Sequence, residues 1–151
     1  MANSQAMATS FKAEVLSGIH ALGTTVVRAG TGADTLKAAL YLASATTNGS
    51  NTAYTATGEV SGTGYTGGGV TVTNATAPTT SGTTGYWTPS ASFVYSSVTL
   101  SSPFDCVMVY NSTQSNKAIG TWTFGSQTIT AGTFTLSMPT NDSTHALIQL
   151  N

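Results

Sequence analysis

Charge is scarce in this sequence. Charged residues make up 6% of the 151 residues, as four cations and five acids. The cations never cluster, since the closest two are nine residues apart; they are Lys12, Arg28, Lys37 and Lys117. A phosphate-binding face needs clustered Lys and Arg, so the composition argues against a nucleic-acid-binding protein. A surface with so little charge must be hydrated mainly by Thr, Ser, Asn and Gly.

Cysteine and long apolar runs are also scarce. Cys106 is the one cysteine, so an intrachain disulfide framework is excluded and the chain is compatible with a reducing cytoplasm. No run approaches the roughly 18 apolar residues of a membrane-spanning helix, so we expect no membrane association. Residues 1–10 have neither a basic nor an apolar segment, so we expect no signal peptide.

The remaining composition favours a folded domain. Hydrophobic residues make up 40% of the chain and the net charge is −1, whereas disordered segments combine low hydrophobicity with high net charge. The length fits one domain. Residues 1–9 are small and polar without a periodic pattern, which predicts a flexible arm that is ordered only if a partner holds it. Residues 10–151 are predicted to form a single domain.

One helix is predicted, directly after the arm. Ser10 is a suitable N-cap and Gly23 a suitable C-cap. The apolar residues between them share one helical face; they are Phe11, Val15, Leu16, Ile19 and Leu22. This stripe either packs on the body of the protein or docks on another subunit. In the second case Phe11 and Leu16 are interface residues.

The rest of the sequence predicts strands. Alternating or apolar segments occur at 35–43, 69–75, 85–88, 92–100, 104–110, 117–124, 127–130, 132–138 and 146–150. Residues 35–43 also suit a helix, but the flanking turn residues favour a strand. Residues 104–110 are apolar on both faces apart from Asp105, which predicts a central strand, and Pro103 is expected to separate it from 92–100.

Within 92–100, Val94, Ser96, Val98 and Leu100 are expected to share one face. Eight or nine short strands separated by turns are typical of an all-β protein. The predicted fold is therefore an antiparallel β-sandwich or jelly roll with one short N-terminal amphipathic helix.

A glycine-rich stretch at 54–72 contains five glycines between Gly62 and Gly69. Gly62, Gly64 and Gly67 satisfy the G-x-G-x-x-G pattern of dinucleotide-binding proteins, which depends on a helix that follows the glycines. Here a β-branched alternating segment follows, so the stretch predicts a tight loop that leads into a strand. We expect no cofactor.

Few side chains could carry catalysis. Cys106 with His20 or His145 could form a nucleophile and base, but a mid-strand cysteine is better explained as a buried apolar residue. Glu59 and Asp105 could pair for glycoside hydrolysis; the alternatives are a bond from Glu59 to loop amides and a strand-end turn at Asp105. We expect no catalytic residues, no metal site and no enzymatic activity.

Six aromatic residues exceed what a small core needs and are divided between core and interface. They are Tyr54, Tyr65, Tyr86, Trp87, Tyr95 and Trp122. Tyr65 and Trp87 each flank a predicted turn, so they are expected at the surface, where they would join Phe11 and Leu16 as residues of a partner interface.

The glycine-rich stretch also carries a resemblance. Glu59 followed by Val60-Ser61-Gly62-Thr63-Gly64-Tyr65-Thr66 resembles a motif of small virion proteins of tailed bacteriophages. Four further blocks match such proteins between about Phe11 and Leu150, at 11–14, 36–41, 109–111 and 146–148. The resemblance implies a capsid cement or decoration protein that binds the outer capsid surface and bridges capsomers.

On this resemblance, the partner is the major capsid protein, the chain is a homo-oligomer (dimer or trimer), and the location is the virion, assembled in the host cytoplasm. An alternative from another class is a receptor-binding or glycan-binding module of a tail fibre or baseplate, which would use aromatic, Asn and Thr side chains. A fold alone does not decide between these functions.

Overall fold

The computed structural model describes residues 3–8, 10, 11, 15, 18–20, 22, 23 and 32–150. Its strands are β1 (Ala6–Met7), β2 (Leu36–Leu42), β3 (Val70–Thr71), β4 (Thr79–Ser81), β5 (Thr84–Trp87), β6 (Phe93–Asn111), β7 (Lys117–Leu136) and β8 (Ile148–Leu150). They form two antiparallel sheets, a five-stranded one in the order β1-β7-β6-β2-β3 and a three-stranded one in the order β4-β5-β8. The prediction of an all-β, antiparallel sandwich is confirmed.

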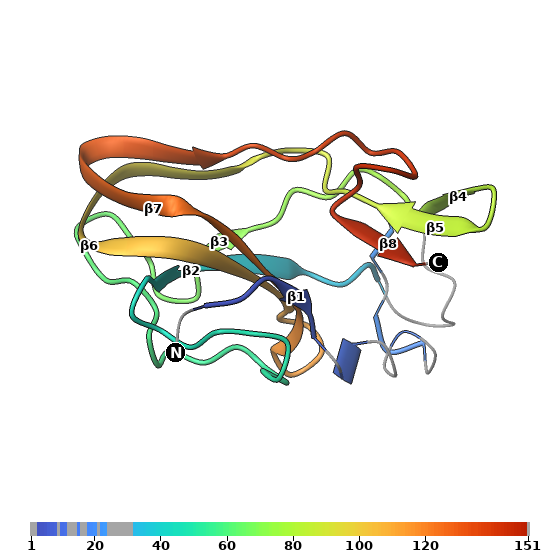
Figure 1. Ribbon diagram of the computed structural model, residues 1–151, viewed down its shortest axis with the longest axis horizontal. Coiled ribbons are helices and arrows are strands. Elements are labelled where there is room, and N and C mark those ends of the chain that lie inside the picture. The colour runs from blue at the N-terminus through green and yellow to red at the C-terminus, as the bar shows by residue number, and fades with distance from the viewer. Residues whose placement is uncertain are drawn as a thin grey trace.

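Two long strands, β6 and β7, build most of the sandwich. Figure 1 shows the pair turning over together at one end of the molecule, so that their two halves lie in different layers. The pairing register shifts between Leu100 and Phe104, where the strands bend. The sequence predicted a break at Pro103, but β6 continues through it. Because pairing is irregular there, the missing N–H of Pro103 breaks no regular ladder, and its carbonyl accepts the Ala43 N–H at 2.9 Å.

An aromatic cluster joins the two layers. The ring of Phe134, on the outer half of β7, lies 5.1 Å from Phe104 and 5.3 Å from Phe124. Tyr95, which is paired with Phe134, donates its hydroxyl to the carbonyl oxygen of Ala38 on β2. Ring contacts of this kind add to the stability from burial. This part of the hydrophobic core therefore lies between the two halves of one bent hairpin, and β2 contributes to it.

A bulge changes which residues of β6 face this core. Tyr95 pairs with Phe134 and Val98 with Gly132, so β6 has one extra residue, and Ser97 there has a φ of 54°. The buried positions are accordingly Phe93 and Tyr95 before the bulge and Val98 and Leu100 after it. The prediction that Val94 shares the face of Val98 is wrong: Val94 is 45% exposed, because a bulge shifts the alternation by one residue.

The other boundaries follow the prediction in part. β2 is a strand as expected, and β6 lies between β7 and β2, which confirms the central position of 104–110. The strands predicted at 117–124, 127–130 and 132–138 are one element, β7, with a positive φ at Ala131. Of the strand predicted at 69–75, β3 covers Val70–Thr71, and the Val72 N–H also donates to the Leu36 carbonyl. The predicted turn at 78–82 contains β4, which reverses at Gly82.

The described residues 3–8 lie along the main sheet. β1 pairs with Thr121 and Gly120 of β7, and the Asn3 side-chain amide donates to the Leu42 carbonyl and the Asp105 carboxylate. The arm predicted at 1–9 therefore contacts the body of its own chain over the described residues 3–8. Of the predicted helix, Ser10, Phe11 and Val15 have helical backbone. Gly18 has a φ of 67° and 19–20 are not helical, so the expected extension to Gly23 is wrong.

Candidate functional site

The carboxylate of Glu59 is the centre of the glycine-rich loop. One oxygen, Oε2, accepts the Tyr54 hydroxyl at 2.6 Å. The other, Oε1, accepts the Tyr65 hydroxyl at 2.8 Å and the Gly68 N–H at 2.7 Å. The backbone of Glu59 also forms a bridge to Tyr41 at the edge of β2. The bond from the Gly68 N–H is the loop-amide bond that was predicted as the alternative to catalysis, whereas the two tyrosine hydroxyl bonds were not predicted.

Tyrosine hydroxyls fasten this loop to the sheet. The Tyr65 hydroxyl oxygen accepts the Leu40 N–H, and the Tyr110 hydroxyl donates to the Gly68 carbonyl at 2.8 Å. The Tyr41 hydroxyl donates to the Thr55 carbonyl at 2.5 Å, and the ring of Tyr54 stacks on that of Tyr110. Each phenol thus provides apolar area together with a defined hydrogen bond.

These tyrosines resist ionisation. Burial, followed by the neighbouring Glu59 carboxylate, raises the pKa of Tyr54 to about 12. Burial also raises the pKa of Tyr41, Tyr65, Tyr95 and Tyr110 above the ordinary value of 10.0. The neutral phenols suit the donor roles that these hydroxyls have in the folded protein.

We expect a steep loss of stability above pH 10. A folded-state pKa above the unfolded value contributes stability that is complete below the unfolded pKa and is lost as the pH rises through the folded pKa. Between about pH 10 and 12 the unfolded chain releases tyrosine protons that the folded chain retains. Absorbance of tyrosinate near 295 nm should therefore rise together with unfolding seen by circular dichroism. Titration of these five tyrosines near pH 10 with the fold intact would contradict this.

The loop glycines have steric roles. A Cβ on Gly62 would lie 2.0 Å from the Thr99 carbonyl oxygen, and one on Gly69 would lie 1.8 Å from the Ala38 carbonyl oxygen. Residues 70–71 then enter β3 and no helix follows. The G-x-G-x-x-G pattern thus belongs to a loop that leads into a strand, as predicted, and lacks the helix that a pyrophosphate site requires. The loop packs against β2 and β6, which the sequence did not predict.

The thiol of Cys106 is part of the core. It is fully buried within β6, and burial, with a smaller effect of Asp105, raises its pKa to about 12. His20 contacts Phe11 and Asn111, whereas His145 contacts Asp142 and Thr144. Neither histidine is therefore placed as a base beside the thiol, and the protonated thiol is a poor nucleophile at neutral pH.

The two acids of the glycosidase hypothesis are engaged separately. Glu59 binds its loop, whereas Asp105 accepts the Asn3 side-chain amide at 2.6 Å. Asp105 lies within β6, so the expected strand-end turn at this residue is wrong. Asp142 accepts from Thr144 and His145, and the Thr144 hydroxyl is the main cause that lowers the pKa of this carboxyl, followed by the Thr144 N–H and the His145 side chain. The residues the structure describes contain no group of three His, Cys, Asp or Glu side chains suited to a metal.

Two of the four predicted interface residues, Phe11 and Trp87, are buried. Trp87 is 1% exposed and its indole N–H donates to Asn74 Oδ1 and the Thr76 carbonyl. Tyr65 is half-buried by its bonds to Glu59 and Leu40. The expectation that Trp87 lies at the surface is wrong, because its ring folds inward from the turn, whereas Tyr65 remains partly exposed. Phe11 is completely buried, and Leu16 lies outside the described residues.

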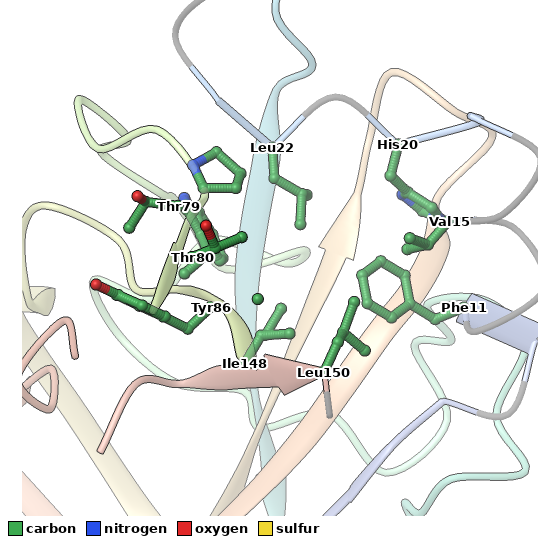
Figure 2. A pocket seen from close by; sticks show the side chains of 12 residues that line it. Phe11, Val15, His20, Leu22, Thr79, Thr80, Tyr86, Ile148 and Leu150 are labelled. Atoms are coloured by element: carbon green, nitrogen blue, oxygen red, sulfur yellow. The ribbon is translucent and has the colours of Figure 1, made fainter. Parts of the chain in front are cut away.

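An apolar groove of about 290 Å³ lies between the N-terminal segment and the three-stranded sheet. Figure 2 shows Phe11, Val15 and Leu22 pointing into this groove, toward Ile148 and Leu150 of β8. These three residues belong to the predicted helical stripe and pack against the core. In the described part of the segment, the stripe therefore faces the body of its own chain.

A second opening surrounds Trp122, beside β1. A cleft of about 330 Å³ is lined by Gln5, Ala6, Met7, Trp122, Ala146, Leu147 and Gln149. The indole is half-buried, and Cη2 lies 2.8 Å from the position of a Cβ on Gly120, so the ring folds back over this glycine. Amide side chains of Gln5 and Gln149 flank it. An aromatic surface beside amides is suited to a ligand with both apolar and hydroxyl faces.

The outer half of the β6–β7 hairpin presents a neutral surface. Its outward residues, here called the neutral face, are Val94, Ser96, Thr133 and Thr135, all of them exposed. Residues 118–141 include no charged side chain. This face was missed from the sequence because the bulge at Ser97 conceals which residues point outward, although the uncharged run itself was visible.

Comparison with known proteins gave no relative: no family model, no curated protein and no solved structure matches this chain. Within the described residues, no helix has the length and apolar character needed to cross a membrane. The basis for assigning a function is therefore the geometry of Glu59 and its tyrosine partners, of the Trp122 cleft and of the neutral face.

Proposed function

We propose that this chain is a structural protein of a bacteriophage virion, a capsid cement or decoration protein that binds the outer capsid surface and bridges neighbouring capsomers. The observation that carries the proposal is the neutral face, which presents exposed hydroxyls and the exposed side chain of Val94. The neighbouring run 118–141 contains no charged residue. The sequence resemblance, carried by the motif from Glu59 to Thr66, points to the same class of protein.

The reactive side chains are engaged within their own chain, which supports a role in binding other proteins. The Glu59 carboxylate binds its own loop and the Cys106 thiol is buried in the core. A neutral surface binds through apolar area and hydrogen bonds, which salt screens little. Many weak contacts on a capsid lattice would add through avidity, so each contact site can remain small. The major capsid protein is the proposed partner.

The test is binding to capsids that lack this protein. Purified chain should co-sediment with such capsids at low salt and at about 1 M salt, since uncharged contacts are weakly screened. Val94→Asp, on the neutral face, should weaken binding about tenfold. Thr57→Asp, at an exposed loop position, is the matched control and should bind like the unmodified chain. Absence of co-sedimentation at every salt concentration would overturn the proposal.

A second candidate is a glycan-binding module of a tail fibre or baseplate, and the Trp122 cleft favours it. The apolar face of a sugar ring could stack on the indole while its hydroxyls bind Gln5 and Gln149. The number of copies per virion separates the candidates. Roughly hundreds of copies indicate the capsid, and about three to a few dozen indicate the tail.

A further inference from the structure

The side of β7 that faces away from β6 is open along its outer half. β1 covers only Gly120 and Thr121, and no strand among the described residues pairs with this side between Thr123 and Leu136. Figure 1 shows this half of β7 at the rim of the molecule. An open strand edge presents unpaired N–H and C=O groups that can pair with another strand.

The register shows which backbone groups point outward. The Thr99 N–H donates away from β7, to the Thr63 carbonyl, so Val98 directs its own groups toward Gly132. Because successive residues of a strand alternate, Gly132 and residues 134 and 136 face β6. Thr133 and Thr135 therefore direct their N–H and C=O groups to the open edge.

This edge lacks the usual protection against pairing. Natural edges carry charged side chains, prolines or bulges. Here the bulge at Ala131 and the proline at 139 lie at the two ends, and the run from Gly132 to Leu136 contains neither charge nor proline. A partner chosen by opposite charge would need charges on this strand. A strand that pairs with itself must avoid like charges facing one another, and this one does.

We propose that the run from Gly132 to Leu136 pairs antiparallel with the same run of a second copy, around a two-fold axis near Phe134. In this register Thr133 lies opposite Thr135 of the second copy, so the outward backbone groups meet as hydrogen-bonded pairs. Opposed threonines are favourable cross-strand neighbours. The pairing would join the outer layers of two sandwiches and place two neutral faces side by side.

The contact is short, so the dimer should be weak, with a Kd on the order of 10 to 100 µM. Sedimentation equilibrium between about 5 and 500 µM should show the mass rising from monomer to dimer. In hydrogen exchange, the amides of Thr133 and Thr135 should become protected as the concentration rises. The amide of Phe134, which faces β6, should be protected throughout.

Two double variants test the register. Thr133→Lys with Thr135→Lys places like charges opposite each other in both pairs and should raise the Kd at least about tenfold. Thr133→Lys with Thr135→Glu places opposite charges together and should retain the dimer at low salt and weaken it at about 1 M salt. All four substitutions are at exposed positions, and circular dichroism with thermal unfolding would verify that both variants fold.

A monomeric unmodified chain over the whole range would overturn the inference, as would equal behaviour of the two double variants. The measurement uses purified protein alone, so its failure is distinct from failure to bind capsids. A dimer lost only in the Lys/Lys variant, with concentration-dependent protection at Thr133 and Thr135, would establish the pairing.

Discussion

Gly69→Ala is expected to destabilise the protein by about 4 kcal/mol or more, or to prevent folding. The added Cβ would lie 1.8 Å from the Ala38 carbonyl oxygen and 2.5 Å from its carbon, both backbone atoms of β2. The φ of Gly69 is 73°, a conformation that L side chains rarely adopt. Neither the strand nor the loop can move without breaking the β2–β3 pairing that begins at the next residue. Urea unfolding measures the loss.

Gly67→Ala is the matched control for this prediction. Gly67 belongs to the same loop, but a Cβ there meets nothing within 4 Å. The change should alter the free energy of unfolding by less than about 1 kcal/mol. If Gly69→Ala were tolerated as well as Gly67→Ala, the loop would not be packed against β2 as described.

Glu59→Ala should cost about 4 kcal/mol of stability. The change removes the acceptor for the Tyr54 and Tyr65 hydroxyls and the Gly68 N–H, which lie 2.6 to 2.8 Å from the carboxylate. Donors left unsatisfied cost roughly 1 to 3 kcal/mol each, and some of them can turn to water. Glu59→Gln keeps the shape but loses the charge and one acceptor, so about 2 kcal/mol is expected. Hydrogen exchange should accelerate first at Gly68.

The control for Glu59 is Asp142→Asn, which removes one negative charge in a turn near the C-terminus. Its side chain accepts from the Thr144 and His145 N–H groups, and asparagine can accept these bonds as well. We expect a change within about 1 kcal/mol. Equal effects of Glu59→Ala and Asp142→Asn would show that Glu59 acts as an ordinary surface charge.

Local sequence patterns were sufficient to predict a strand where one or both of its faces are buried. Residues 36–42 and 104–110 are apolar apart from Lys37 and Asp105, and they pair with each other in the centre of the main sheet. Their burial dominates any local preference, including the helix propensity of 35–43. The buried cysteine follows from the same pattern, because Cys106 lies between apolar residues of a central strand.

Patterns failed where a single irregular residue changes the alternation. Ser97 and Ala131 adopt positive φ, so the alternation of core-facing and outward residues shifts by one within each strand. Val94 therefore turns outward. The sequence does not mark either position as a bulge, since neither residue is glycine. Trp87 was misplaced for a related reason: its indole turns inward to bonds with Asn74 and Thr76, which lie 11 or more residues away.

The sequence by itself determined that the chain is an antiparallel β protein with little charge and a tight glycine loop, because alternation, composition and glycine spacing act over short distances. Only the tertiary structure decided that β6 and β7 bend into both layers, that Glu59 is bound by Tyr54 and Tyr65, and that the edge of β7 is open. These features depend on pairing register and on contacts between distant segments, and a one-residue shift in register reverses every side chain of a strand.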